Sequence, residues 1–290
     1  MRIFCRLTCF VVIAFCACAP AWADPALWVA KSSTATVYLF GTVHVLPKDA
    51  QWHYPVLDKA LAASSKLMVE EDDDDTLAMQ ALVLKYGVDL AHPLSASLDA
   101  AERAQLDAAA KGAGVPGGAA ALDPMRPWLA ALTITVAPIV KAGYDPKSGA
   151  DKQLQRGFKA AGKPIGAFET AEQQIRIFAD LSPAAQEDLL RNALRDYAKG
   201  PVLIKRTIAD WQAGDVAGLA QLVNSDMRKQ YPGLYRVLLV DRNENWAHQI
   251  KALLDDHATI FVAVGTGHLV GPDRVQAQLL KLGIKTERVH

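Results

Sequence analysis

The sequence predicts an α/β fold, with a mixed sheet built from both chain ends and a large, mostly helical insertion. Runs of apolar, β-branched and aromatic residues, which are typical of strands, cluster at 27–40 and 66–69 and again at 259–264 and 285–289. Between these ends, apolar residues recur every three or four positions, which is typical of helices. We therefore expect a single α/β domain over 24–290, with the helical insertion at about 73–255.

The N-terminal part of this domain predicts a hairpin followed by a strand–helix–strand unit. Strands at 27–30 and 36–40 are joined by a polar turn, a helix is expected over 49–64, and the next strand covers 66–69. Such a connection is right-handed and makes its two strands parallel. The residues that follow these two strands should therefore meet at one edge of the sheet.

The middle of the chain predicts helices, and the end returns to the sheet. A short strand at 163–168 interrupts the helices, and Ser182 and Asp215 have the positions of N-caps. The last elements are a strand at 259–264, a helix at 272–282 and a strand at 285–289. The expected helices of the insertion cover 76–86, 95–111, 127–142, 147–161, 171–178, 182–197, 201–213, 216–223 and one or two helices within 235–255.

Two copies of Gly-Thr-x-His end two of the predicted strands. Gly41 leads to His44 after the first copy, and Gly265 leads to His268 after the second. Glycine allows the chain to turn tightly at the end of a strand, and it lets neighbouring backbone approach closely. Both imidazoles should then lie at the carboxyl edge of the sheet, where α/β folds place their binding sites.

Glu70 is the third candidate for this edge, because it directly follows the strand at 66–69. The acidic run continues to residue 75, and its later members are typical of a solvated surface. Two histidines and a carboxylate suit a divalent first-row metal with open coordination positions. The same groups without a metal would act as general base and acid on a water molecule.

The sequence lacks the motifs that are typical of several classes of enzyme. His-Glu-x-x-His, Gly-x-Ser-x-Gly and Gly-x-Gly-x-x-Gly are all absent, which argues against common zinc peptidases, serine hydrolases and nucleotide cofactors. The 31 basic and 31 acidic residues balance, so net charge offers no argument for a nucleic-acid partner.

Residues 1–23 are predicted to be a signal peptide. Arg2 and Arg6 precede a short apolar core, and Ala21-Trp22-Ala23 fits a cleavage site, so we expect cleavage after Ala23. The apolar core is too short to span a bilayer comfortably, so no stable membrane span is expected after cleavage. All four cysteines lie in this segment. The mature protein is therefore expected to be periplasmic or secreted, and to have no thiol.

An ordered set of motifs resembles the TraB/GumN (TraB/PrgY/GumN) family over essentially the whole mature chain. Each piece is weak alone, but the order is specific. The matching pieces are Leu27-Trp28, Tyr38 to His44, Leu67 to Asp72, Arg126-Pro127-Trp128, Gly149-Ala150-Asp151, Gly162-Lys163-Pro164, Glu169-Thr170, Gln174, Arg242-Asn243, Trp246 and Val264 to Gly271.

The resemblance implies a histidine- or metal-dependent hydrolase fold. The family is similar to the Tiki metalloproteases, with paired Gly-x-x-His motifs, a strand-ending glutamate and a divalent metal, and more distantly to erythromycin esterase and ChaN-like haem-binding proteins. On this basis His44, His268 and Glu70 would hold manganese, cobalt or zinc, and Arg242 would stabilise an oxyanion. The expected function is hydrolysis of a peptide or another small molecule, most simply as a peptidase. Two alternatives remain open: a non-catalytic peptide- or haem-binding protein, and a metal-free esterase with His44 as base and Glu70 orienting it.

Three further residues allow ordinary structural interpretations. Glu169 would be either a second acid near the site or, with Thr170, a helix cap. Asp151 fits a charge at a helix N-terminus, and Trp246 fits a core or groove-lining aromatic.

Overall fold

The computed structural model describes residues 24–72 and 76–290. The predicted signal peptide with its four cysteines, and residues 73–75 of the acidic run, lie outside the described residues. Within the described part, no helix is both long and apolar enough to cross a membrane.

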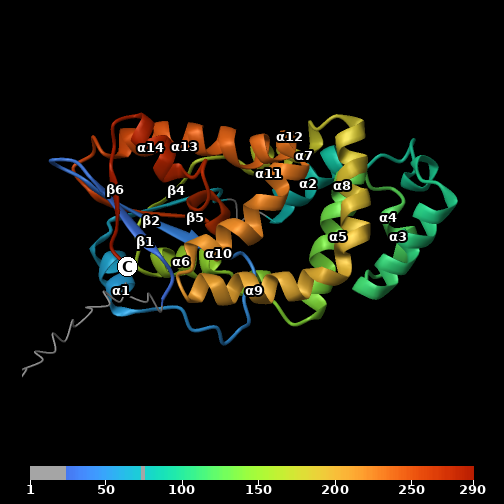
Figure 1. Ribbon diagram of the computed structural model, residues 1–290, viewed down its shortest axis with the longest axis horizontal. Coiled ribbons are helices and arrows are strands. Elements are labelled where there is room, and N and C mark those ends of the chain that lie inside the picture. The colour runs from blue at the N-terminus through green and yellow to red at the C-terminus, as the bar shows by residue number, and fades with distance from the viewer. Residues whose placement is uncertain (1–23, 73–75) are drawn as a thin grey trace, which may run out of the picture.

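A six-stranded mixed sheet occupies one end of the molecule (Figure 1), and its strands come from both ends of the chain. The strand order is β4-β3-β5-β2-β1-β6. Strands β4, β3, β5 and β2 are parallel, whereas β1 runs antiparallel to β2 and β6. The predicted α/β fold with a mixed sheet is therefore confirmed. The strands are β1 (Leu27–Lys31), β2 (Thr36–Thr42), β3 (Lys66–Val69), β4 (Ile165–Ala167), β5 (Thr259–Gly265) and β6 (Thr286–Arg288).

The two strands that carry Gly-Thr-x-His lie side by side. Strand β2 pairs with β5 along its whole length, from Thr36 opposite Thr259 to Thr42 opposite Gly265. Strand β3 pairs with the other edge of β5, so β5 separates the two strands of the predicted strand–helix–strand unit. All three strands still point the same way, and their carboxyl ends share one edge.

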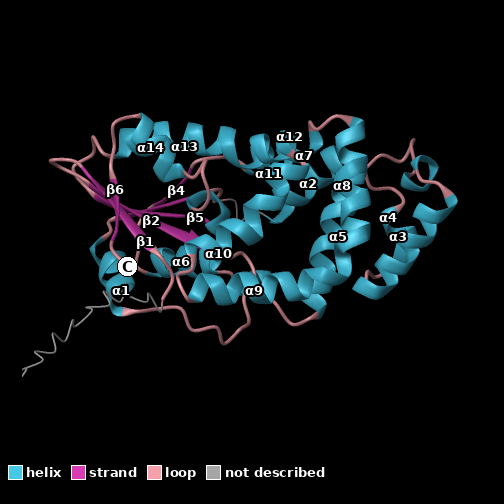
Figure 2. Ribbon diagram, viewed as in Figure 1, coloured by secondary structure: helices cyan, strands magenta, loops and turns pink. Residues whose placement is uncertain are grey.

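Helices cover both faces of the sheet and continue into a helical region at the other end of the molecule (Figure 2). The α-helices are α1 (Pro55–Ala63), α2 (Thr76–Gly87), α3 (Ala100–Ala113), α4 (Gly118–Leu122), α5 (Pro127–Lys141), α6 (Ala150–Ala160), α7 (Ala171–Ala179), α8 (Pro183–Asp196), α9 (Gly200–Gln212), α10 (Val216–Leu219), α11 (Asp226–Gln230), α12 (Pro232–Tyr235), α13 (Asp241–Leu253) and α14 (Val275–Lys281). Short 3-10 helices are η1 (Leu94–Ser97), η2 (Pro146–Ser148), η3 (Tyr197–Lys199) and η6 (Thr266–Leu269), and the π-helical segments are η4 (Ala220–Ser225) and η5 (Arg236–Val240).

Three apolar clusters account for this arrangement. Leu57 of α1, Phe158 of α6 and Trp211 of α9 pack on one face of the sheet. Helices α13 and α14 cover the opposite face, with Trp246 and Leu279 fully or almost fully buried. A third cluster joins α3, α4, α5 and α8, and it includes no residue of the sheet. The helical region therefore has a hydrophobic core of its own.

The caps expected from the sequence form where a polar side chain reaches the first turn. Ser182 and Asp215 accept hydrogen bonds from Ala185 and Gly218. Thr170 forms the capping box of α7 with Gln173, so the cap belongs to Thr170 and leaves the Glu169 carboxylate for other contacts. The helix expected over 95–111 begins later, at Ala100, because Asp99 caps it.

Candidate functional site

Four parallel strands deliver acidic or imidazole side chains to one edge of the sheet. His44 follows β2, Glu70 follows β3, and Glu169 follows β4 by two residues. His268 lies in η6, which begins directly after β5. Since carboxyl ends of parallel strands meet at one edge, residues far apart in the chain become neighbours here.

The three residues predicted to form the site converge on Gly265. Its backbone N–H donates to Glu70 Oε1 at 2.6 Å. A Cβ atom on Gly265 would lie 3.0 Å from Glu70 Oε1 and 3.1 Å from His44 Nε2. His268 Nε2 is 3.8 Å from the same Glu70 oxygen. Glycine at 265 therefore leaves the space in which these three side chains approach one another.

Arg242 of α13 holds the acidic side of the cluster together. Its Nη2 donates to Glu70 Oε2 at 2.7 Å and to Glu169 Oε2 at 2.8 Å, and its Nε donates to Glu169 Oε1 at 2.8 Å. Its Nη1 donates to the Leu238 carbonyl and lies 3.1 Å from His268 Nε2. The five N–H groups of the guanidinium thus all have acceptors.

His268 is a buried imidazole whose proton position follows from its partners. Its Nε2 faces the guanidinium of Arg242, so Nδ1 carries the proton and donates to Asn243 Oδ1 at 2.6 Å. Burial lowers the pKa of His268. The charge of Glu70 opposes this effect, but the positive charges of Arg242 and His44 add to it, and the pKa falls to about 3. His268 is therefore neutral at pH 7.

His44 has the opposite protonation state to His268 and is also more exposed. Its Nδ1 lies 3.4 Å from Asp151 Oδ2, and its side chain is 60% exposed, whereas that of His268 is 6% exposed. Desolvation lowers the pKa of His44, but the hydrogen bond to Asp151 and the charges of Glu70 and Asp151 outweigh it and raise the pKa to about 9. His44 therefore carries a positive charge at neutral pH.

Glu70 remains ionised despite being buried. Burial raises its pKa, but the basic side chains of His268, Arg242 and His44 and the N–H of Gly265 lower it to about 2. A carboxylate that accepts a backbone N–H and a guanidinium is stabilised in its charged form. The cluster thus combines a fixed anion, a fixed cation and two histidines with different proton states.

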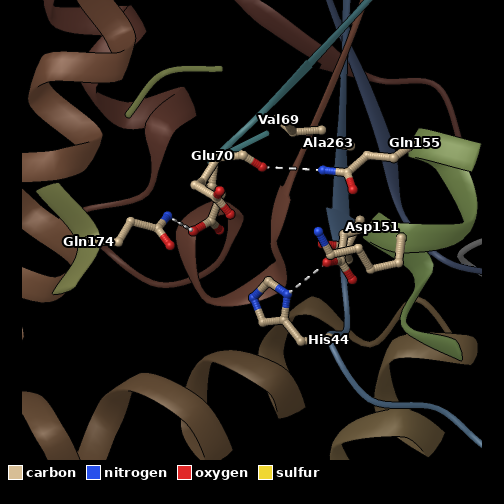
Figure 3. Close-up of a pocket in the computed structure, with 10 residues that line it drawn as sticks. His44, Val69, Glu70, Asp151, Gln155, Gln174 and Ala263 are labelled. Carbon is tan, nitrogen blue, oxygen red and sulfur yellow. Dashed lines mark hydrogen bonds and ion pairs between the residues drawn. The ribbon is translucent and has the colours of Figure 1, made fainter. Parts of the chain in front are cut away.

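Two cavities meet at His44 and Glu70. One has a volume of about 240 Å³ and polar walls that include Asp151, Gln155 and Gln174. In Figure 3, His44 and Glu70 approach this pocket from different sides, with Asp151 next to His44 and Gln174 next to Glu70. The other cavity, of about 490 Å³, continues past Arg242 and His268. Its remaining walls are mostly aliphatic, and they come from α5, α9, α11, η4 and η5.

The imidazole and carboxylate donors have the chemistry that a first-row metal ion prefers. In the described arrangement, however, Arg242 Nη1 lies at His268 Nε2, the atom that would bind the ion. Within 24–72 and 76–290, no three His, Cys, Asp or Glu side chains are placed to hold a metal. The expected set of His44, Glu70 and His268 therefore does not fit an ion as these side chains stand.

Glu169, Trp246 and Asp151, for which the sequence allowed ordinary structural roles, also contact the site residues. Glu169 binds Arg242 and accepts the indole N–H of Trp246 at 3.0 Å. Trp246 also lies against His268, with 4.4 Å between ring centroids. Asp151 lies in the first turn of α6, as expected for a helix N-terminal charge, and also binds His44. Two features of the sequence could have placed Glu169 and Trp246 at the site. Glu169 follows a strand, and Trp246 lies one helical turn after Arg242.

Fold and site together define an α/β protein with paired strand-end histidines and an arginine-linked pair of glutamates. The TraB/PrgY/gumN family model matches residues 26–288, and the chain belongs to this family. It is also similar to YbaP of Escherichia coli (strain K12) and of Shigella flexneri, which are described as uncharacterized. Each is 27% identical over 157 residues, covering 52% of this chain and 55% of the relative. The chain thus spans about half the length of these relatives, and no solved structure matches it.

Proposed function

We propose that this protein is a hydrolase that cleaves an ester or amide bond at the edge of the sheet. The observation that carries the proposal is the approach of His44 Nε2 and Glu70 Oε1 to the same position beside Gly265, at the junction of two cavities. A hydrolase needs a place for a water molecule beside a group that can take its proton. The junction offers both.

In this proposal His44 transfers the proton. The active form is neutral His44, which is the minor form at pH 7 because the pKa of His44 is about 9. Water adds to the carbonyl carbon of the substrate while Nε2 of this neutral form accepts its proton, and Nε2 then returns that proton to the departing oxygen or nitrogen. The products are a carboxylic acid and an alcohol or amine, so the atoms balance. Asp151 orients the imidazole through Nδ1.

Arg242 contributes a fixed positive charge rather than a free hydrogen-bond donor. All of its N–H groups are already engaged by Glu70, Glu169, Leu238 and His268. Its charge near the junction still favours the negative oxygen that develops on the substrate. The oxyanion role expected of Arg242 is therefore electrostatic in this proposal.

A metal-dependent peptidase is the second form of the proposal. The donor chemistry of His44, Glu70 and His268 favours it, but the guanidinium of Arg242 would first have to leave His268 Nε2. An ion bound there would supply a water molecule of lowered pKa. Manganese, cobalt and zinc are the ions to test.

The test is hydrolysis of an ester, amide and peptide panel by the mature chain, with and without chelator and after adding back each metal. We expect His44→Ala to lower activity about 10²- to 10⁴-fold. His53→Ala should leave it unchanged, because His53 pairs with Asp58 at the surface. Activity that survives the chelator supports the metal-free form, and loss that a metal restores supports the metal-dependent form. No hydrolysis of any panel member would refute the proposal.

A further inference from the structure

The two cavities beside the cluster have opposite chemistry. The larger cavity is lined mainly by aliphatic side chains, including Val136, Ile204, Val223 and Leu238. The smaller pocket is lined by charged and amide side chains. Both include His44, Glu70 and Thr42, so a bond positioned between His44 and Glu70 would have one substituent in each cavity.

The polar pocket contains buried polar atoms without a partner. Thr42 Oγ1, Asp151 Oδ1 and Gln155 Oε1 are all buried and form no hydrogen bond among the described residues. Thr42 is 1% exposed and Gln155 is 4% exposed. Buried polar groups in proteins are nearly always satisfied, and leaving one unpaired costs about 1–3 kcal/mol. Three such atoms belong to residues that line one pocket, and this favours a ligand that supplies their hydrogen bonds.

These atoms also specify the ligand. The carboxylate oxygen of Asp151 and the amide oxygen of Gln155 are acceptors, and the hydroxyl of Thr42 both accepts and donates. They therefore suit a group that donates hydrogen bonds, such as an amine, a primary amide or a hydroxyl. Asp151 and Gln155 are one turn apart on α6, which places both on the same face of the helix.

The aliphatic cavity suits an apolar group of the same substrate. A volume of 490 Å³ lies within the range of small-molecule sites, about 300–1,000 Å³. Two of its walls come from the π-helical segments η4 and η5, through Val223 and Leu238. Single-turn π segments occur frequently at functional sites, where they displace side chains from the regular helical position. Arg242 and Gly265 also line the cavity, next to the proposed site of bond cleavage.

We propose that the substrate is an N-acyl amide with an apolar acyl chain and a polar amine part. The acyl chain lies in the aliphatic cavity, and the amine part donates hydrogen bonds to Thr42, Asp151 and Gln155. This inference rests on the proposed hydrolase function. Water is added across the C–N bond, so the products are a fatty acid in the aliphatic cavity and a free amine in the polar pocket.

The aliphatic half is tested by binding, which does not require turnover. Calorimetry would compare octanamide with propanamide, two uncharged probes that differ only in chain length. We expect octanamide to bind at least about tenfold more tightly, since one methylene in an apolar pocket contributes about tenfold or more. Equal affinities would overturn the proposal.

Two valines on α5 provide a matched pair for the same measurement. Val136 lines the cavity and is 41% exposed, whereas Val140 lies one turn further along the helix, is 45% exposed and does not line it. Val136→Asp should weaken octanamide binding about tenfold. Val140→Asp should leave it unchanged. Because both positions are exposed, both variants should fold, and equal effects would overturn the assignment.

The polar half is tested with Thr42→Val, which keeps the shape of the side chain but removes the unpaired hydroxyl. A structural role predicts only an unchanged or higher Tm. A ligand role predicts in addition a roughly tenfold lower kcat/KM for N-octanoylglycinamide than in the wild type. The kcat/KM for octanoyl anilide, whose leaving group has no such donors, should change less. Equal changes for both substrates would overturn the polar assignment.

The outcomes of the two proposals are distinguishable. If octanamide binds as expected but no amide or ester is hydrolysed, the hydrolase function fails and the aliphatic binding site stands. If amides are hydrolysed without regard to acyl length, the hydrolase function stands and the substrate proposal fails.

Discussion

The two Gly-Thr-x-His turns have nearly the same local sequence but place their histidines in opposite environments. His44 lies between two cavities and is held by Asp151, and its pKa is raised to about 9. His268 is buried between Arg242, Asn243 and Trp246, and its pKa is lowered to about 3. The motif places an imidazole at the sheet edge. Its proton state is decided by side chains from α6 and α13, which come from other parts of the chain.

This difference suggests separate roles for the two histidines. A proton-transfer group needs access to substrate and a proton that it can exchange, and His44 has both. A neutral, buried imidazole with both nitrogens engaged is a fixed part of the framework around Glu70. The following changes test that division of roles.

Removing Arg242 should have the largest effect on stability. Arg242→Met would leave Glu70 and Glu169 buried without their common counter-charge, which costs about 3–5 kcal/mol for a broken buried pair. Urea unfolding of the variant measures this loss. Arg236→Met is the control, because Arg236 and Asp241 form an exposed pair worth about 1 kcal/mol or less. Equal losses in the two variants would contradict the role given to Arg242.

The buried imidazole should make the protein sensitive to acid. His268 has a folded pKa below its unfolded value of 6.5, so the folded state binds fewer protons and loses stability as the pH falls towards 3. Glu70, lowered from 4.5 to about 2, adds to the loss below pH 4.5. The expected slope from His268 is about 1.4 kcal/mol per pH unit below pH 6.5.

Unfolding free energies measured between pH 4.5 and 8 check this sign. His268→Gln should be less stable at pH 8 but should lack the slope between pH 6.5 and 4.5. His53→Gln, at an exposed histidine, should keep the wild-type slope. If His268→Gln keeps it as well, another group is responsible.

The two glycines that begin the turns should respond differently to alanine. A Cβ at Gly41 would lie 2.9 Å from Thr266 Oγ1 and 3.1 Å from Thr266 Cα, so backbone must move at a cost of about 1–3 kcal/mol. A Cβ at Gly265 meets the ends of the Glu70 and His44 side chains, which can shift. Gly41→Ala should therefore lower the Tm more, and Gly265→Ala should lower activity more. Paired thermal unfolding and activity measurements would reveal the opposite order if this interpretation is wrong.

Asp151→Asn should change the proton state of His44 with the smallest effect on stability. Removal of the negative charge should lower the pKa of His44 from about 9 towards its ordinary value of 6.5. The folded pKa is above the unfolded value, so this contribution to stability is complete below pH 6.5 and is lost as the pH rises through 9. Because His44 is largely exposed, we expect a change of less than about 1 kcal/mol. NMR titration of the His44 ring measures the shift, and the His268 ring should not titrate in the same pH range, because its pKa is about 3.

Local sequence patterns determined much of the fold and identified the main candidate site residues. Runs of apolar, β-branched and aromatic residues predicted the strands at both ends, and apolar residues at three- and four-residue spacing predicted the helical middle. Strand ends predicted that His44, Glu70 and His268 would share one edge, since parallel strands present their carboxyl ends together. Asp215 and Ser182 were predictable as caps because capping depends on residues within one turn.

Only the tertiary structure decided which partners these residues have. Arg242 was open to pairing with Asp241 or Glu244 on its own helix, but α13 packs on the sheet so that it reaches Glu70 and Glu169. Asp151 and Glu169 gained their contacts in the same way, from elements more than 70 residues away in the chain. Sequence periodicity reports which face of an element is buried. Proton states and hydrogen-bond partners depend instead on distances of a few ångströms between elements, which only packing determines.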